Sequence, residues 1–422
     1  MNLREQFDLS EDRGYLPAED PARRFGAGPF FKYPHSDNIH AACYLLLEDS
    51  KNIPKLLVAG QFRNFVDNFD SNRYLGIAGV GTGKASGDVD SEVRLVMNLL
   101  SFMAHAYLWG GDTPATVLPQ VIAVPWHAVA KKVGRPPIQS YVSYAIDNWY
   151  RIDKSQGITL DNIALIQNFL AGVDEEWFTM IHVVMEAQAG PALAGAYDAC
   201  VAANEQDWET VKNCLFKIAA SLGQLYQTFC RMEEKCDPYI YYNRVRPYIF
   251  GTLNNPNLPD GLIYEGVEEY RGKPQKFRGE TGAQSAIIPA LDGAMGIHHK
   301  GKTGKKEKEE DVLKTYLMEM REYMPPKHRA FIEWCEENGN LRKHLKNKKN
   351  SAMELPYNLC IEWMEAFRTK HMEFAGKYIV KQGQSASAVG HGGSTLYGTG
   401  GTPFMKYLKK HRDETADHKV IK

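Results

Sequence analysis

The chain reads Pro356-Tyr-Asn-Leu-Cys-Ile-Glu-Trp-Met-Glu-Ala-Phe-Arg-Thr-Lys-His371-Met-Glu-Phe-Ala-Gly-Lys-Tyr-Ile379 towards its C-terminal end. The large apolar residues of this stretch recur at steps of three and four, the spacing that places side chains on one face of a helix. This stripe consists of Tyr357, Cys360, Met364, Phe367, His371, Phe374 and Tyr378. The spacing therefore predicts an amphipathic helix over 353–380 whose His371 points into an apolar interior.

His371 on such a stripe has two interpretations. A lone histidine on an apolar face is more often a core residue hydrogen-bonded to backbone than a metal ligand. A neutral imidazole is also a good axial ligand for haem iron, and Arg368, one turn earlier on nearly the same face, would meet the carboxylate edge of such a planar ligand. Cys360 lies three turns away from His371, so we expect a packed core thiol there.

The overall composition favours a helical protein that binds small molecules. Strand signals are few and helical patterns are many, so we expect a mostly α fold. The 50 basic and 51 acidic residues give a formal charge of −1, which offers no global attraction to nucleic acid or to an anionic membrane. The seven cysteines contain no CxxC pair, which argues against zinc and disulfides. Without an apolar run of membrane-spanning length or a signal-peptide pattern, we expect a cytoplasmic protein.

The chain length and one long apolar segment suggest two domains. With 422 residues the chain exceeds the usual size of one domain. Residues 91–109 are apolar nearly all round and precede a glycine pair, which predicts a buried helix that ends there. We expect a small, mainly helical N-terminal cap domain over 1–111, a connector over 112–125, and a large all-helical domain over 126–422. The composition of the Gly- and Ser-rich segment 383–402 predicts mobility. Helical patterns in the large domain cover 137–151, 161–188, 192–201, 205–235, 238–250, 284–297, 311–322, 326–337 and 353–380.

Several motifs resemble the indoleamine 2,3-dioxygenase family, in the same order along the chain. They are Ile122-Ala-Val-Pro125, Asp260-Gly-Leu-Ile-Tyr-Glu-Gly266, Met320-Arg-Glu-Tyr-Met-Pro-Pro-Lys-His-Arg329, Arg368-x-x-His371 with Lys377-Tyr-Ile379, and Gly398-Thr-Gly-Gly-Thr402-Pro-Phe-Met-Lys-Tyr-Leu408. The resemblance runs from about Val93 to about Lys410, and the first ninety residues match poorly. It implies a haem-dependent dioxygenase that opens the indole C2–C3 bond of L-tryptophan, or of a related indoleamine, with O2 to give N-formylkynurenine.

The resemblance also implies roles around the haem. His371 would be the axial ligand of one haem b per chain, and Arg368 would bind a propionate. Asp292 would accept a hydrogen bond from the other nitrogen of His371, although an aspartate in such a position is otherwise an ordinary capping or surface residue. On the distal side, Phe178 would pack on the indole. His182, where the family commonly has serine, would bond the indole N–H, as a histidine does in the related tryptophan 2,3-dioxygenases; otherwise it is a buried histidine bonded to a backbone carbonyl.

A substrate clamp is implied by the segment that starts at Asp237-Pro238, a helix-start signal. Tyr241 and Arg246 match the family's aromatic contact and its carboxylate-binding arginine. Pro247 departs from the family pattern and should bend the helix, which could change where Arg246 points. Arg244 is the alternative clamp. The remaining implied substrate contacts are Tyr141, Tyr144, Ala145, Thr281, Gly282, Thr399 and Gly400.

The partner expectations follow from the same resemblance. The protein would take an indole substrate, O2 and an electron donor for the ferric haem, with no nucleic-acid or membrane partner, and we expect a monomer. Two alternatives stay open at this point: a haem enzyme of the same superfamily that acts on a different indole, and a non-catalytic haem or gas sensor.

Overall fold

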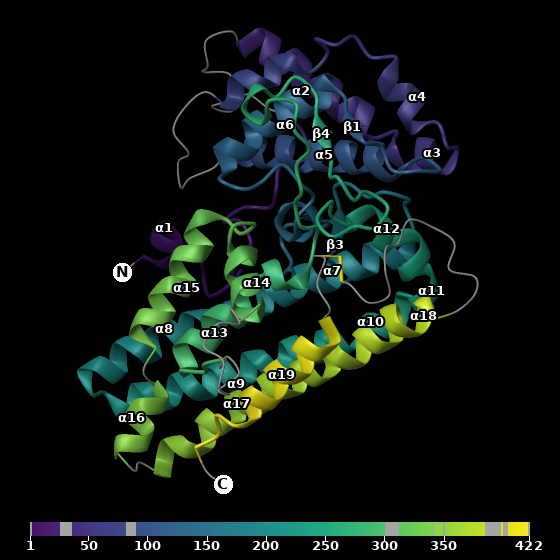
Figure 1. Ribbon diagram of the computed structural model, residues 1–422. Coiled ribbons are helices and arrows are strands. Elements are labelled where there is room, and N and C mark those ends of the chain that lie inside the picture. The colour runs from purple at the N-terminus through teal and green to yellow at the C-terminus, as the bar shows by residue number, and fades with distance from the viewer. Residues whose placement is uncertain are drawn as a thin grey trace.

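The computed structural model describes residues 2–25, 36–81, 90–299, 312–339, 341–348, 351–384, 398–399 and 404–420. The described part of the chain is mostly helical, and its named strands form two short pairs (Figure 1). β1 (Val117–Leu118) runs parallel to β4 (Ile263–Tyr264), and β2 (Trp149–Arg151) runs antiparallel to β3 (Ile163–Leu165). The expected mostly α fold is confirmed.

The helices form an upper and a lower group in Figure 1. The upper group contains α2 (Ser36–Ser50), α3 (Ile53–Val58), α4 (Phe62–Asp67), α5 (Ser91–Trp109) and α6 (Gln120–Val133). The longer helices below are α7 (Val173–Gln188), α8 (Gly190–Glu205), α9 (Trp208–Cys230), α13 (Ile287–Met295), α14 (Val312–Arg321), α15 (Pro326–Asn338), α16 (Leu341–Lys348), α17 (Ser351–Ala375) and α19 (Phe404–Ala416). The short ones are α1 (Leu3–Phe7), α10 (Met232–Lys235), α11 (Pro238–Ile240), α12 (Arg246–Ile249) and α18 (Lys381–Gly383). Within the described ranges, no helix combines the length and the apolar character that crossing a membrane would require.

Local sequence signals locate several helix ends correctly. The Asp237 carboxylate accepts hydrogen bonds from the backbone N–H groups of Tyr239 (2.8 Å) and Ile240 (3.1 Å), as an N-cap does. The carboxylate of Asp90 caps α5 in the same way, and α5 ends at Trp109, directly before Gly110, as predicted. α5 is buried on nearly all of its faces, because apolar residues surround its axis.

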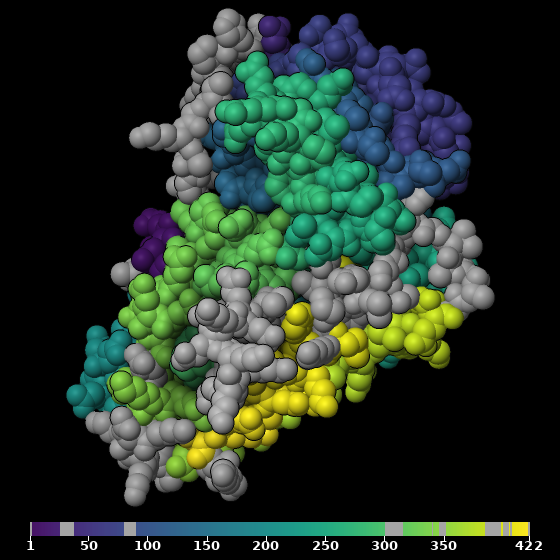
Figure 2. All heavy atoms as spheres, viewed as in Figure 1, coloured from purple at the N-terminus to yellow at the C-terminus, as the bar shows by residue number. Residues whose placement is uncertain are grey.

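The described residues form two large apolar cores and one small apolar cluster, and each large core combines segments that are distant in the sequence. Phe7 and Tyr15 from the N-terminal segment pack into the lower core, beside residues of α7, α8 and α15. Ile249 and Tyr264, from the middle of the chain, pack into the upper core with α5 and α6. Figure 2 shows the same interleaving at the surface, where the green mid-chain residues lie against the blue N-terminal part. The predicted domain boundary at 112–125 stays a prediction, and α6 already starts within that range.

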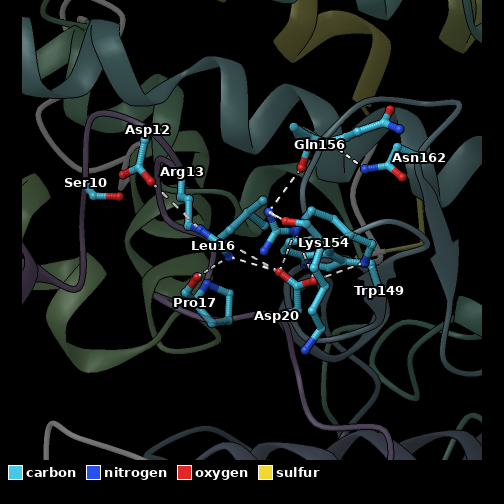
Figure 3. Close-up of polar contacts among 12 residues, drawn as sticks. Ser10, Asp12, Arg13, Leu16, Pro17, Asp20, Trp149, Lys154, Gln156 and Asn162 are labelled. Atoms are coloured by element: carbon cyan, nitrogen blue, oxygen red, sulfur yellow. Dashed lines mark hydrogen bonds and ion pairs between the residues drawn. The ribbon is translucent and has the colours of Figure 1, made fainter.

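Asp20 ties the N-terminal segment to the β2–β3 hairpin (Figure 3). One carboxylate oxygen of Asp20 accepts from the guanidinium groups of Arg13 (3.2 Å) and Arg151 (3.1 Å), and the other accepts from the Arg151 backbone N–H at 3.1 Å. Burial alone would raise the pKa of Asp20, but the hydrogen bonds from Arg151 and Arg13 lower it below its usual value. The charged carboxylate thereby fixes the path of the first twenty residues.

Two predicted helices are wrong in part, because a hairpin replaces them. The pattern over 137–151 yields one π-helical turn and then β2, and the pattern over 161–188 starts with β3 and becomes helical only at α7. The side chain of Asn148 donates to the Gln167 carbonyl (2.9 Å) and accepts from the Gln167 N–H (2.9 Å). This buried contact between distant residues stabilises the hairpin, and no helical spacing signals it.

The described part of the chain contains three π-helical turns near α7: the first and second pack against α7, and the third packs against the second. They are η3 (Val142–Ile146), η4 (Tyr241–Val245) and η7 (Gly376–Val380). η4 directly precedes α12, where Pro247 has no N–H to offer the Asn243 carbonyl. A π turn thus lies directly before the place where this proline is expected to bend the helix, and the bend itself stays a prediction. A π turn adds a residue to a helical turn and is frequent at functional sites. These three turns therefore mark a candidate functional region.

Two glycines bring the segment before η6 (Gly282–Gln284) against the end of α12. Gly251 and Gly279 face each other so closely that a side chain on either would clash with the backbone of the other. The Glu280 N–H then donates to the Ile249 carbonyl at 3.0 Å. This contact fixes the backbone on both sides of Glu280.

Replacing Gly279 by alanine should lower the free energy of unfolding by about 1–3 kcal/mol, the usual cost of overpacking. The added Cβ would lie 2.3 Å from the Gly251 nitrogen and 2.4 Å from the Ile249 oxygen. The urea midpoint of unfolding measures the change. Gly157→Ala is the control, because a Cβ at Gly157 meets no atom within 4 Å. Equal midpoints for the two variants would contradict the close approach.

Candidate active site

A cavity of about 820 Å³ lies among α7, α9, α13, α17 and α19. Its volume falls in the range of small-molecule and cofactor sites, about 300–1,000 Å³. It is lined by these residues that the sequence singled out: Tyr141, Phe178, His182, Tyr241, Thr281, Gly282, Asp292, Arg368, His371 and Thr399. Tyr144, Ala145 and Arg246 do not line it, and Gly400 lies outside the described residues. Most of segment 383–402, including the predicted mobile loop, also lies outside them.

His371 lies on α17 as predicted, and its accessible surface faces the cavity. The rings of Phe229 and Phe367 flank it at centroid distances of 6.3 and 6.5 Å. Neither of its ring nitrogens hydrogen-bonds to any described residue. Burial, with smaller effects of His182 and Arg368, lowers the pKa of His371 to about 4. The imidazole is therefore neutral at physiological pH, with a lone pair available to a metal.

The α17 stripe also carries Cys360, and this thiol belongs to the core. Cys360 is fully buried, and its Sγ donates to the Leu215 carbonyl on α9 at 3.2 Å. It does not line the cavity. The expectation of a packed core thiol is confirmed.

Phe178 and His182 lie one turn apart on α7 and face the cavity together. The His182 Nδ1 is 2.7 Å from the Phe178 carbonyl oxygen, and a carbonyl can only accept, so Nδ1 carries the proton. Burial lowers the pKa of His182, which keeps the ring neutral. Nε2 therefore has a lone pair and is an acceptor for a ligand N–H. Tyr241, at 4.9 Å from the Phe178 ring, and Tyr141, at 5.8 Å from the His182 ring, complete an aromatic chamber.

A buried carboxyl group that the sequence did not single out holds Tyr141 in place. The Tyr141 hydroxyl donates to one oxygen of Glu186 at 3.0 Å, and Ser285 donates to the same oxygen at 2.7 Å. Burial raises the pKa of Glu186 to about 7. Glu186 lies on α7, two helical turns after Phe178. No signal in the sequence indicates this contact, because its partners Tyr141 and Ser285 come from other segments.

Three residues expected at the substrate lie behind the cavity wall. Arg246 is fully buried, with its guanidinium carbon 5.3 Å from the Tyr242 ring centre and 5.0 Å from that of Phe250. Tyr144 stacks on Phe102 at 5.9 Å, and its neighbour Ala145 is also in the core. The clamp role of Arg246 stays a prediction.

Asp292 pairs with Arg368 and His299, and not with His371 as expected. Its Oδ2 accepts from the Arg368 guanidinium at 2.6 Å and contacts His299 Nε2 at 3.1 Å. Burial alone would raise the pKa of Asp292, but Arg368 and His299 lower it to about 2. No hydrogen bond joins Asp292 to His371 among the residues placed by the structure. Asp292 therefore orients Arg368 at the cavity wall.

The other nitrogen of His299 ties this cluster to the C-terminal helix. His299 Nδ1 lies 2.8 Å from a carboxylate oxygen of Glu414, and the His299 ring stacks on His411 at 4.1 Å. Burial would lower the pKa of His299, but the hydrogen bond to Asp292 raises it above its usual value. The ligand atoms of His299, His411 and Glu414 lie within 4.8 Å of one another, so this trio could also hold a metal ion. The sequence could not reveal it, because His299 is more than one hundred residues from His411 and Glu414.

Comparisons with known proteins cover almost the whole chain. The family model described as "Indoleamine 2,3-dioxygenase" matches residues 3–418. Indoleamine 2,3-dioxygenase 1 of Rattus norvegicus is 31% identical over 373 residues, which cover 87% of this chain and 87% of the relative. Indoleamine 2,3-dioxygenase of Saccharomyces cerevisiae is 29% identical over 450 residues, which cover 99% and 94%. Indoleamine 2,3-dioxygenase nanC of Aspergillus nanangensis is 33% identical over 331 residues, which cover 75% and 78%. The similarity includes the N-terminal region, which the motifs alone did not reach.

The His299 contacts should make stability depend on pH. Because the pKa of His299 is raised in the folded state, its contribution is full below the unfolded pKa of about 6.5 and is lost as pH rises through the folded value. His299→Gln should therefore destabilise the protein by about 1–3 kcal/mol at pH 6 and by less at pH 9, measured by urea unfolding. His298→Gln is the matched control, because that side chain is exposed. The same loss at both pH values would contradict a charged His299.

Proposed function

Because the chain belongs to the indoleamine 2,3-dioxygenase family, whose members are haem-dependent dioxygenases, we propose that it uses O2 to open the indole C2–C3 bond of L-tryptophan, forming N-formylkynurenine. The observation that carries the proposal is the position of His371. Its neutral imidazole lines the same cavity as Phe178, Tyr241 and His182, which form the aromatic chamber. A candidate metal ligand and an aromatic chamber therefore share one cavity.

The residues that line the cavity suit one haem b. His371 would ligate the iron, since it is neutral and has no hydrogen-bond partner among the described residues. Arg368 would meet a propionate group at the wall, held in position by Asp292. When bound, the haem iron supplies the redox chemistry that lets O2 react with a closed-shell organic molecule, after a separate electron donor has reduced it.

The side chains of the aromatic chamber would orient the indole. His182 Nε2 would accept a hydrogen bond from the indole N–H, because its other nitrogen already donates to the Phe178 carbonyl. The rings of Phe178 and Tyr241 would pack against the indole faces. The indole carbons are electron-rich, so no side chain has to act as an obligatory base. The protein's contribution is to position the indole and to exclude water.

A related indole is the second candidate substrate. Arg246, the expected partner of an amino-acid carboxylate, does not line the cavity, and Tyr241 and His182 depart from the residues familiar in the family. A pocket that does not present this arginine has less reason to require a carboxylate. Members of this family are enzymes, which argues against the alternative of a non-catalytic haem or gas sensor.

The direct test of the proposal is an assay of the haem-loaded, chemically reduced protein with L-tryptophan in air. We expect N-formylkynurenine, measured by its absorbance and identified by mass. A second reaction with tryptamine, analysed by mass, tests the related-indole alternative. Haem-loaded protein that consumes neither indole would contradict the proposed function.

Two histidine variants separate haem binding from substrate binding. His371→Ala should abolish stable haem uptake, seen as loss of the Soret band, because the iron loses its ligand. His182→Ala should keep the Soret band but lower kcat/KM about 3- to 10-fold, the value of one neutral hydrogen bond. An unchanged Soret spectrum in His371→Ala would refute the ligand assignment.

A further inference from the structure

Glu280 is a cavity residue that the family motifs did not point to. It precedes the predicted contact Thr281, lines the cavity, and is only 3% exposed. Its backbone is fixed on both sides, because its N–H donates to the Ile249 carbonyl and its own carbonyl accepts from the Thr399 hydroxyl. The fold therefore fixes the backbone that carries this carboxyl group.

The Glu280 carboxyl group has no hydrogen bond or ion pair with any residue in the part of the chain that the structure describes. The other acidic residues that line the cavity differ: Asp292 is paired with Arg368, and Glu336 with Arg321. Burial is the cause that raises the pKa of Glu280 to about 8. A buried carboxyl group without a partner is costly, and at a binding site the missing partner is often a ligand.

Aromatic rings of the substrate chamber lie near Glu280. Burial raises the pKa of Tyr241, and the negative charge of Glu280 raises it further. The same charge also adds to the raised pKa of Tyr141, after burial and Glu186. A carboxylate beside the electron-rich faces of tyrosine rings is a setting that attracts an organic cation.

Arginines that line the described cavity offer no comparable site for an anion beside the indole chamber. Arg321 and Arg368 are already paired with Glu336 and Asp292. Arg246 lies behind the wall. The chamber thus presents a carboxyl group, and not a guanidinium, to the polar end of an indole ligand.

We propose that Glu280 binds the ammonium group of the substrate, so that the site recognises primary indolealkylamines through their amine, whether or not they carry a carboxylate. This inference rests on the proposed function. On binding, the Glu280 carboxyl group gives its proton to solvent, and the resulting carboxylate pairs with the ammonium. Glu280 is thereby a residue that determines specificity.

Three probes test this in the wild-type, haem-loaded protein: tryptamine, which has only the amine; indole-3-propionate, which has only the carboxylate; and L-tryptophan, which has both. Dissociation constants come from changes in the Soret band. We expect tryptamine to bind at least about 10-fold more tightly than indole-3-propionate. Tryptamine affinity should increase as pH rises towards about 8 and then level off, because Glu280 ionises in that range.

Glu280→Gln keeps the size of the side chain and removes its charge. It should weaken tryptamine binding about 10- to 100-fold, abolish its pH dependence, and leave indole-3-propionate binding unchanged or stronger. Glu336→Gln is the matched control, since it removes a charge from a cavity residue that is already paired with Arg321. It should keep both the preference and the pH dependence.

Each outcome decides the question. Tighter binding of indole-3-propionate by the wild type, as expected if a protonated Glu280 donated to a carboxylate, would overturn the inference, and so would an unchanged tryptamine preference in Glu280→Gln. If that variant does not fold, the probe series and the pH dependence of the wild type still decide. Turnover of L-tryptophan without an amine preference defeats this inference alone, whereas haem-loaded protein that binds none of the three indoles defeats the proposed function with it.

Discussion

Removal of water from the cavity wall is the constraint on which the rest of the site depends. Burial lowers the pKa of His371 and His182, so both rings are neutral, and it raises the pKa of Glu280, so its carboxyl group is mostly protonated without a ligand. At pH 7, ionising a carboxyl group with a pKa of about 8 costs roughly 1.4 kcal/mol. A charge-assisted hydrogen bond returns about 1.5–3 kcal/mol. An ammonium ligand can therefore ionise Glu280.

The two ends of the cavity differ in whether their buried ionisable groups are paired. At the Arg368 end, Asp292 and His299 form a closed set of ion pairs, in which each charge compensates another. At the aromatic end, Glu280 and the two neutral histidines are without such compensation from described residues. The paired end suits a cofactor that stays bound, and the unpaired end suits a substrate that binds and dissociates.

The backbone supports this division. The π turn η3 directly follows Tyr141, η4 begins at Tyr241, and η7 contains the cavity residue Tyr378. η4 ends at Val245, and Arg246 follows as the first residue of α12, where its guanidinium lies against Tyr242 and Phe250 and does not line the cavity. The chamber residue Tyr241 and the arginine behind the wall thus come from the two ends of one irregular helical segment.

The sequence by itself determined what depends on local spacing. The apolar stripe predicted α17 and the direction of His371, Asp237 predicted a helix start, and the ordered motifs predicted the family. Only the tertiary structure decided the rest: the unpaired carboxyl group of Glu280, the cluster around His299, the hairpin that replaced two predicted helices, and the position of Arg246 behind the wall. The physical reason is that periodicity and caps report interactions within a few residues, whereas burial and pairing of charges depend on segments that meet only when the whole chain packs.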